Sequence, residues 1–202
     1  FGWRAIFLAY VLFALVALCW LLLRQAETLT TENRRPLTAG NLSSAFREVV
    51  GNADVRIYTL VLCLGFGQMF ALLSTIQPIF DRTYDRAAEF PLWFAGIAAM
   101  SATASFINSR FVMRLGMRRL ATLAYAGAAT LSLAALALVG AGAVGGTASF
   151  AVFYIWATSV FFIAGLTFGN LNALAVQKLG HIAGMATSVI TAISTVAAAL
   201  IA

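Results

Sequence analysis

Four side-chain amides lie within long apolar segments of the chain: Gln68, Gln77, Asn170 and Asn172. Placing an amide against lipid hydrocarbon is costly, so each is expected to face a water-filled cavity or the interior of a helix bundle. An amide donates and accepts hydrogen bonds. These four residues are therefore candidates for lining a polar cavity.

Smaller polar residues recur at helical spacing in the same segments. Ser101, Ser105 and Asn108 fall at i, i+4 and i+7, and two further stripes consist of Tyr154, Thr158, Phe161, Gly165, Gly169 and Asn172, and of Thr187, Thr191 and Ser194. For a single Ser, Thr or Gly, helix packing and bonds to the helix's own backbone are a sufficient explanation. Together the stripes predict helices that line a path. The candidate cavity residues are Gln68, Ser74, Gln77, Ser105, Tyr154, Thr158, Asn170, Asn172 and Thr187.

Ionisable residues are absent from the deep parts of these apolar segments. Such residues usually mark proton relays or ion paths, so we expect no proton-coupling carboxylate in this chain. A membrane-embedded hydrolase or acyltransferase would need a positioned His, an acid, or a Ser with a base. We therefore expect no enzyme activity, no catalytic residue and no metal site. Cys19 and Cys63 lie in apolar segments without C-x-x-C spacing and are predicted to be packing residues.

Composition sets the class of protein. Of 202 residues 62% are hydrophobic and 10% charged, whereas soluble domains carry about 25% charged residues. Six predicted spans cover residues 5–23, 57–80, 90–107, 120–139, 150–171 and 183–202. Each reaches about 27 Å or more as a helix, enough to cross a bilayer. We predict an all-α polytopic membrane protein whose partner is the lipid bilayer, not nucleic acid.

The basic residues predict its orientation. Ten lie on one side of the membrane (Arg24, Arg34, Arg35, Arg47, Arg56, Arg110, Arg114, Arg118, Arg119 and Lys178) and three on the other (Arg4, Arg82 and Arg86). The richer side is expected to be cytoplasmic. The cytoplasmic loops would then be residues 24–56, 109–119 and 175–182. His181 and the opposite loop, residues 81–89, are expected to be solvated.

Residues 24–56 form the one long polar connection, with Pro36 and Gly40 as breaks. Within it Leu42, Phe46 and Val49 fall at i, i+4 and i+7, which predicts a short interfacial amphipathic helix capped by Asn41 or Ser43. Both a hinge between two bundles and an ordinary interhelical loop fit this stretch.

The segment "NSRFVMRLGMRR", residues 108–119, carries four arginines between two apolar segments. It resembles the loop signature of the major facilitator superfamily, a Gly…Asp-Arg-x-Gly-x-Arg-type pattern. Gly116 matches the anchoring glycine, with Arg114 before it and Arg118 after it. Met113 stands in place of the acid and Ser109 in place of the first glycine. The stretches "FGWRAIF", "GFGQMFALLSTIQP" and "FGNLNALAVQKLGHIAGMATSV" resemble the bicyclomycin and chloramphenicol resistance branch of drug:proton antiporters.

The resemblance implies helices six to eleven of a twelve-helix bundle. Residues 1–23 would be the last helix of the N-terminal bundle, 24–56 the central cytoplasmic linker, and 57–202 the C-terminal bundle without its final helix. The missing N-terminal half would be the partner and would hold the coupling carboxylates.

The function implied is proton-coupled efflux of drugs or small amphipathic metabolites by alternating access in the inner membrane, as in antibiotic resistance. No cofactor is expected beyond the proton gradient. An importer of a small metabolite or sugar is the alternative. The loop residues expected to brace the conformational change are Asn108, Arg110, Arg114, Gly116, Arg118 and Arg119.

Overall fold

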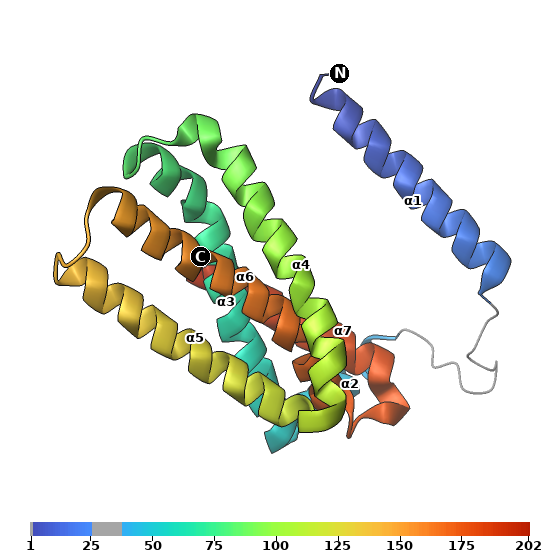
Figure 1. Cartoon of the computed structure of the whole chain (residues 1–202). Coiled ribbons are helices and arrows are strands. Elements are labelled where there is room, and N and C mark those ends of the chain that lie inside the picture. The colour runs from blue at the N-terminus through green and yellow to red at the C-terminus, as the bar shows by residue number, and fades with distance from the viewer. Residues whose placement is uncertain (1, 26–37) are drawn as a thin grey trace. The chain divides into compact units, whose positions relative to one another are not determined.

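The computed structural model describes residues 2–25 and 38–202. In this part of the chain every regular element is a helix (Figure 1). The long helices are α1 (Arg4–Arg24), α2 (Ala39–Gly51), α3 (Ala53–Arg82), α4 (Phe90–Leu115), α5 (Met117–Gly140), α6 (Gly146–Val176) and α7 (Ala183–Ile201), and the short 3-10 helices are η2 (Ala87–Glu89) and η3 (Gly180–Ile182).

Six of these helices are long and apolar enough to cross a membrane, namely all the long helices except α2. Each contains most or all of one predicted span, so the predicted all-α, multi-pass class is confirmed. Most extend past the predicted limits because a helix does not stop where the hydrocarbon does. The 31 residues of α6 make a helix of about 46 Å, longer than the roughly 30 Å core of a bilayer.

The chain divides into two compact units, Phe1–Asn41 and Leu42–Ala202. In the first unit α1 is apolar on all sides, and none of its residues is buried. A helix of this kind requires lipid or another protein surface around it. Arg34, Arg35 and Pro36 of the predicted linker lie outside the described residues.

The N-terminus of α2 differs from the prediction. The helix begins at Ala39, and Thr38 caps it, because its Oγ1 accepts a hydrogen bond of 3.2 Å from the Asn41 backbone N–H. The prediction that Asn41 or Ser43 is the cap was wrong, since both residues lie inside the helix.

The predicted apolar face of α2 is also divided in two. Val49 is buried in the core together with Ala45, whereas Leu42 and Phe46 stay exposed. The small Ala45 allows close packing, and the exposed Leu42 and Phe46 remain available to the interface of a membrane.

The second unit is built around α6, which packs against α3, α4 and α5, while α7 packs along α3 (Figure 1). At one end of the unit an aromatic cluster surrounds the fully buried Phe80. The Phe80 ring makes edge-to-face contacts with Phe90, Phe150 and Phe153 at centroid distances of 5.3, 5.4 and 6.1 Å. Edge-to-face geometry suits the ring quadrupoles and locks α3, α4 and α6 together.

The loop between α3 and α4 folds onto this cluster. Arg86 pairs with Glu89 at 3.0 Å and lies over the Phe150 ring at 4.5 Å, and Trp93 Nε1 donates to Glu89 at 2.8 Å. Most residues of this loop are exposed, as predicted, and Arg86 and Glu89 in addition pair with each other. Arg86 can contact a carboxylate and an aromatic face together.

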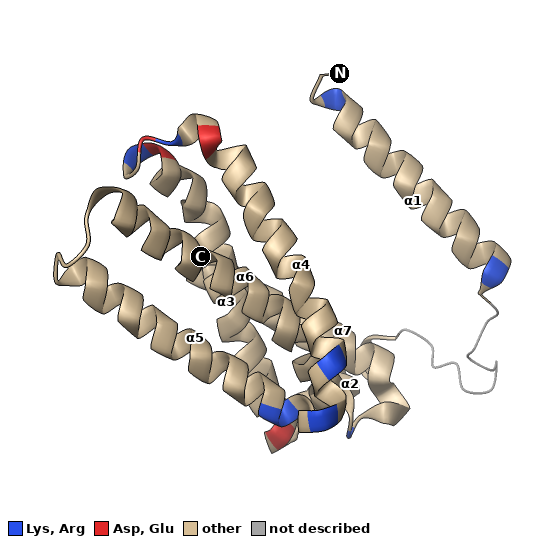
Figure 2. Cartoon of the chain, in the orientation of Figure 1, with Lys and Arg blue, Asp and Glu red and all other residues tan. Residues whose placement is uncertain are grey.

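Most charged residues of the second unit lie toward its two ends (Figure 2). One end carries Asp81, Arg82, Asp85, Arg86 and Glu89, and the other carries the α4–α5 turn with its four arginines. We call the latter the basic end. That the basic end faces the cytoplasm remains a prediction.

Candidate functional site

The C-terminal half of α6 presents an exposed side at Gly169. Phe168 stacks against Phe66 of α3 at a centroid distance of 4.2 Å, and Asn170 bonds to α4. Gly169 lies between these two residues in sequence and is exposed, with no atom within 4 Å of where a Cβ would stand. The side of α6 that Gly169 occupies therefore borders neither α3 nor α4 directly.

Asn172 lies one turn from Gly169 and has an unpartnered oxygen. Its Nδ2 donates to the Phe168 carbonyl at 3.0 Å, but its Oδ1 is buried without a hydrogen-bond partner among the described residues. Ser101 Oγ on α4 is likewise buried without a hydrogen-bond partner among the described residues. The backbone of Ser101 lies beside Gly165 of α6. An unsatisfied buried acceptor costs about 1–3 kcal/mol, so water, a ligand or another chain is expected to satisfy it.

Asn170 and Asn108 are brought together. Asn170 Nδ2 donates to Asn108 Oδ1 at 2.7 Å and lies 3.0 Å from the Leu166 carbonyl. Asn170, a candidate cavity residue, is only 5% exposed. In this structure it ties α6 to α4 near the basic end.

Tyr154 and Thr158 turn toward a different region. Tyr154 Oη donates to the Trp93 carbonyl at 3.2 Å, and Thr158 Oγ1 donates to the Tyr154 carbonyl at 2.7 Å. Both line an apolar groove of about 240 Å³ formed with Met100 and Leu131 of α4 and α5. The predicted stripe on α6 is thus divided between this groove and the open side at Gly169.

The remaining candidates lie on exposed helix sides. Ser74 and Gln77 line a groove of about 320 Å³ near Asp81 and Arg82, at the end of α3. The other three, which are exposed and line none of these grooves, are Gln68, Ser105 and Thr187. On α7 the predicted stripe is split, because Ser194 is fully buried and its Oγ lies 3.9 Å from the Cys63 Sγ of α3.

The turn of the basic loop is a single residue. Gly116 ends α4 and begins α5 with φ 77° and ψ 151°, and its N–H donates to the Val112 carbonyl at 2.9 Å. An L-residue with a side chain rarely adopts this backbone conformation. Arg114 lies in the last turn of α4 and Arg118 in the first turn of α5. None of the four arginines of this loop makes an ion pair with a described residue.

Sequence reasoning missed a charged pair at the same end. Lys178, just after α6, donates a hydrogen bond to Asp54 in the first turn of α3. This carboxylate raises the pKa of the Lys178 ammonium, which keeps the ion pair charged at neutral pH. The only signal in the sequence was that both residues fall on the same predicted side of the membrane.

His181 has a partner as well. Its Nε2 lies 2.9 Å from Glu48 Oε1, which joins η3 to α2. His181 is exposed, as expected of a solvated histidine, and Glu48 of α2 lies within reach of its ring as well.

Comparison with known proteins gives the family. A model of the Major Facilitator Superfamily matches residues 1–202. The bicyclomycin resistance protein homolog of Haemophilus influenzae is 28% identical over 127 residues, which cover 62% of this chain and 32% of the relative. The chain thus spans about a third of that relative's length. No solved structure gives a significant match.

These matches confirm the resemblance that the loop and helix motifs predicted. The family match extends over every helix described above, and the relative carries the name of the predicted branch. The chain therefore belongs to the Major Facilitator Superfamily, whose members are membrane transporters and not enzymes.

Proposed function

We propose that the chain is part of a proton-coupled exporter of drugs or small amphipathic metabolites. It would act by alternating access in the inner membrane, with the rest of the protein supplying the facing bundle. Family membership supports transport, and the relative named for bicyclomycin resistance supports export of a small organic molecule.

The observation that carries the proposal is the open side of α6 at Gly169 and Asn172. It combines an exposed surface without a side chain at Gly169 and a buried amide oxygen at Asn172 that has no hydrogen-bond partner among the described residues. An amide oxygen accepts hydrogen bonds from neutral and cationic groups alike. A site of this kind suits amphipathic molecules that carry a polar or cationic group.

The proton-coupling group would come from elsewhere in the intact protein. The acidic residues described in the second unit, such as Asp54 and Asp81, lie at helix ends and not in the middle of a span. The four arginines of the α4–α5 turn, which form no ion pair with a described residue, would brace the bundle by binding helix-end carbonyls or acids of the facing half. Such contacts would differ between the two access states.

The proposal is tested with cells that express the intact protein and are loaded with ethidium, a lipophilic cation. The cells should lose the dye faster than cells without the protein, and a protonophore should abolish the difference. Asn172→Leu should lower the rate, whereas Thr130→Val, on the exposed side of α5, should not. Export that survives collapse of the gradient would reject proton coupling, and gradient-driven accumulation would favour the importer.

A further inference from the structure

We propose that the basic end of the second unit holds an anionic phospholipid in a groove between α3 and α5. Arg118 would bind the lipid phosphate, and the apolar wall of the groove would take the first part of an acyl chain. This inference rests on binding geometry alone and stands independently of what the protein transports.

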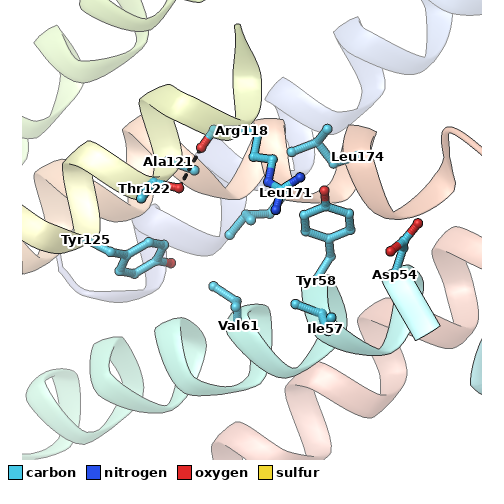
Figure 3. A pocket seen from close by; sticks show the side chains of 10 residues that line it. All are labelled: Asp54, Ile57, Tyr58, Val61, Arg118, Ala121, Thr122, Tyr125, Leu171 and Leu174. Carbon is cyan, nitrogen blue, oxygen red and sulfur yellow. Dashed lines mark hydrogen bonds between the residues drawn. The ribbon is translucent and has the colours of Figure 1, made fainter. Parts of the chain in front are cut away.

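The groove has a volume of about 400 Å³, with α6 as its floor (Figure 3). Figure 3 shows Arg118 reaching into it from α5 and Tyr58 from α3. A second hollow of about 430 Å³ is lined by Arg118, Arg119, Thr122 and Leu123. Arg118 and Thr122 line both hollows. One guanidinium therefore serves two adjoining concave surfaces.

The charge of Arg118 is available for an anion. Its guanidinium makes no ion pair with a described residue, and the same holds for Arg119 beside it. The one acid in the groove lining, Asp54, is bound by Lys178 and also lies close enough to Arg118 for electrostatic attraction. Arg118, Arg119 and Lys178 set three cations against this one carboxylate, so the balance of charge around the groove is positive. A phosphate accepts hydrogen bonds from an arginine fork with good geometry.

The walls of the groove indicate a lipid in preference to a free phosphate. Beside Arg118 most of the lining is apolar and includes Ile57, Val61 and Leu171, although two tyrosines and a threonine also line the groove. Ile57 is 58% exposed in a helix that is long and apolar enough to cross a membrane, so this wall is open to an acyl chain. A basic group at a helix end above an apolar groove matches a phospholipid, whose phosphate sits directly above its acyl chains. A soluble phosphate would bind the guanidinium of Arg118 but would make no contact with the apolar wall of the groove.

The direct test is native mass spectrometry of the intact protein with phosphatidylglycerol or phosphatidylcholine of identical acyl chains. Phosphatidylglycerol should remain bound at collision energies that remove phosphatidylcholine. Arg118→Gln should reduce the retained phosphatidylglycerol about fivefold, the effect expected of one basic residue at a membrane surface. Arg110→Gln is the control, because it removes one positive charge from the same segment, residues 108–119, and Arg110 lines neither hollow. This variant should retain nearly as much phosphatidylglycerol as the unmodified protein.

A second variant tests the apolar wall without altering any charge. Val61→Trp should fill the groove and lower retention of phosphatidylglycerol, while inorganic phosphate should not displace the lipid. Three results would overturn the proposal: equal retention of the two lipids, equal losses in Arg118→Gln and Arg110→Gln, or full retention in Val61→Trp. The first is also expected if another helix of the intact protein fills the groove. Displacement by inorganic phosphate would instead indicate a simple anion site and would equally reject a lipid site.

Discussion

The side-chain amide of Asn170 on α6 donates a 2.7 Å hydrogen bond to Oδ1 of Asn108 on α4. Asn170 is almost fully buried, and Asn108 is partly buried in the last turns of α4. Asn108 lies about two helical turns before Gly116, so the bond fixes the spacing of α4 and α6 near the basic end.

A double-mutant cycle on Asn108→Ala and Asn170→Ala should give a coupling free energy of about 0.6–2 kcal/mol. Hydrogen bonds between transmembrane helices contribute in this range. Denaturant unfolding of the intact protein in detergent measures the coupling. The control cycle pairs Asn108→Ala with Ser188→Ala, whose hydroxyl bonds only its own helix, and it should show none. Additive losses in the Asn108–Asn170 cycle would mean that the bond is absent in the membrane protein.

Gly65→Ala should destabilise the bundle. A Cβ at this position would stand 2.8 Å from Phe168 Cε1 and 2.8 Å from Tyr125 Oη, so α3 could not approach α6 as closely. Overpacking of this kind costs about 1–3 kcal/mol. Gly127→Ala in α5 is the matched control, since no atom lies within 4 Å of its Cβ position, and it should be neutral or stabilising. The temperature at which each purified variant unfolds gives the comparison, and equal values would reject the close α3–α6 approach.

Gly116→Ala should lower the free energy of unfolding by about 1–3 kcal/mol, because alanine would be strained in the backbone conformation of this position. Open space surrounds the position, but its φ of 77° disfavours any side chain. Gly51→Ala, at an equally open position without a positive φ, provides the control. Thermal unfolding should separate the two variants. If they unfolded at the same temperature, the turn would not require the left-handed conformation.

The orientation of the bundle can be tested by labelling in a background that lacks Cys19 and Cys63. Ser109→Cys at the basic end should react with an impermeant maleimide only after the cells are permeabilised. Thr83→Cys at the opposite end should react in intact cells, because basic loops are retained in the cytoplasm. The reverse pattern would invert the topology.

The spans could be predicted from the sequence because hydropathy and length respond to the thickness of the bilayer. Their ends could not, since local capping decides them. Asn52 shows this for α3, where its Oδ1 accepts hydrogen bonds from Asp54 N–H at 3.1 Å and Val55 N–H at 3.4 Å, so the helix begins at Ala53 and not at residue 57. Thr38 does the same for α2.

The contacts between helices could not be predicted from periodicity. A stripe identifies a face of one helix, but it does not identify the neighbour that the face meets. Tyr154 and Asn172 fall in one stripe, yet Tyr154 bonds to Trp93 of α4, whereas the Asn172 oxygen accepts no hydrogen bond from a described residue. The pairing of His181 with Glu48 likewise depends on how α2 packs, which single-sequence patterns do not encode. The role of the candidate residues in transport stays a prediction.

The central claim is that the open side of α6 lines the transport path, and Gly169 allows it to be tested most directly. Gly169→Cys and Gly127→Cys both place a thiol where no atom lies within 4 Å of the Cβ, the first on α6 and the second on α5. In a background without Cys19 and Cys63, an impermeant maleimide should label Gly169→Cys and leave Gly127→Cys unreactive in lipid. A transported substrate should slow the labelling of Gly169→Cys. An unreactive Gly169→Cys, or labelling that substrate does not slow, would contradict the account.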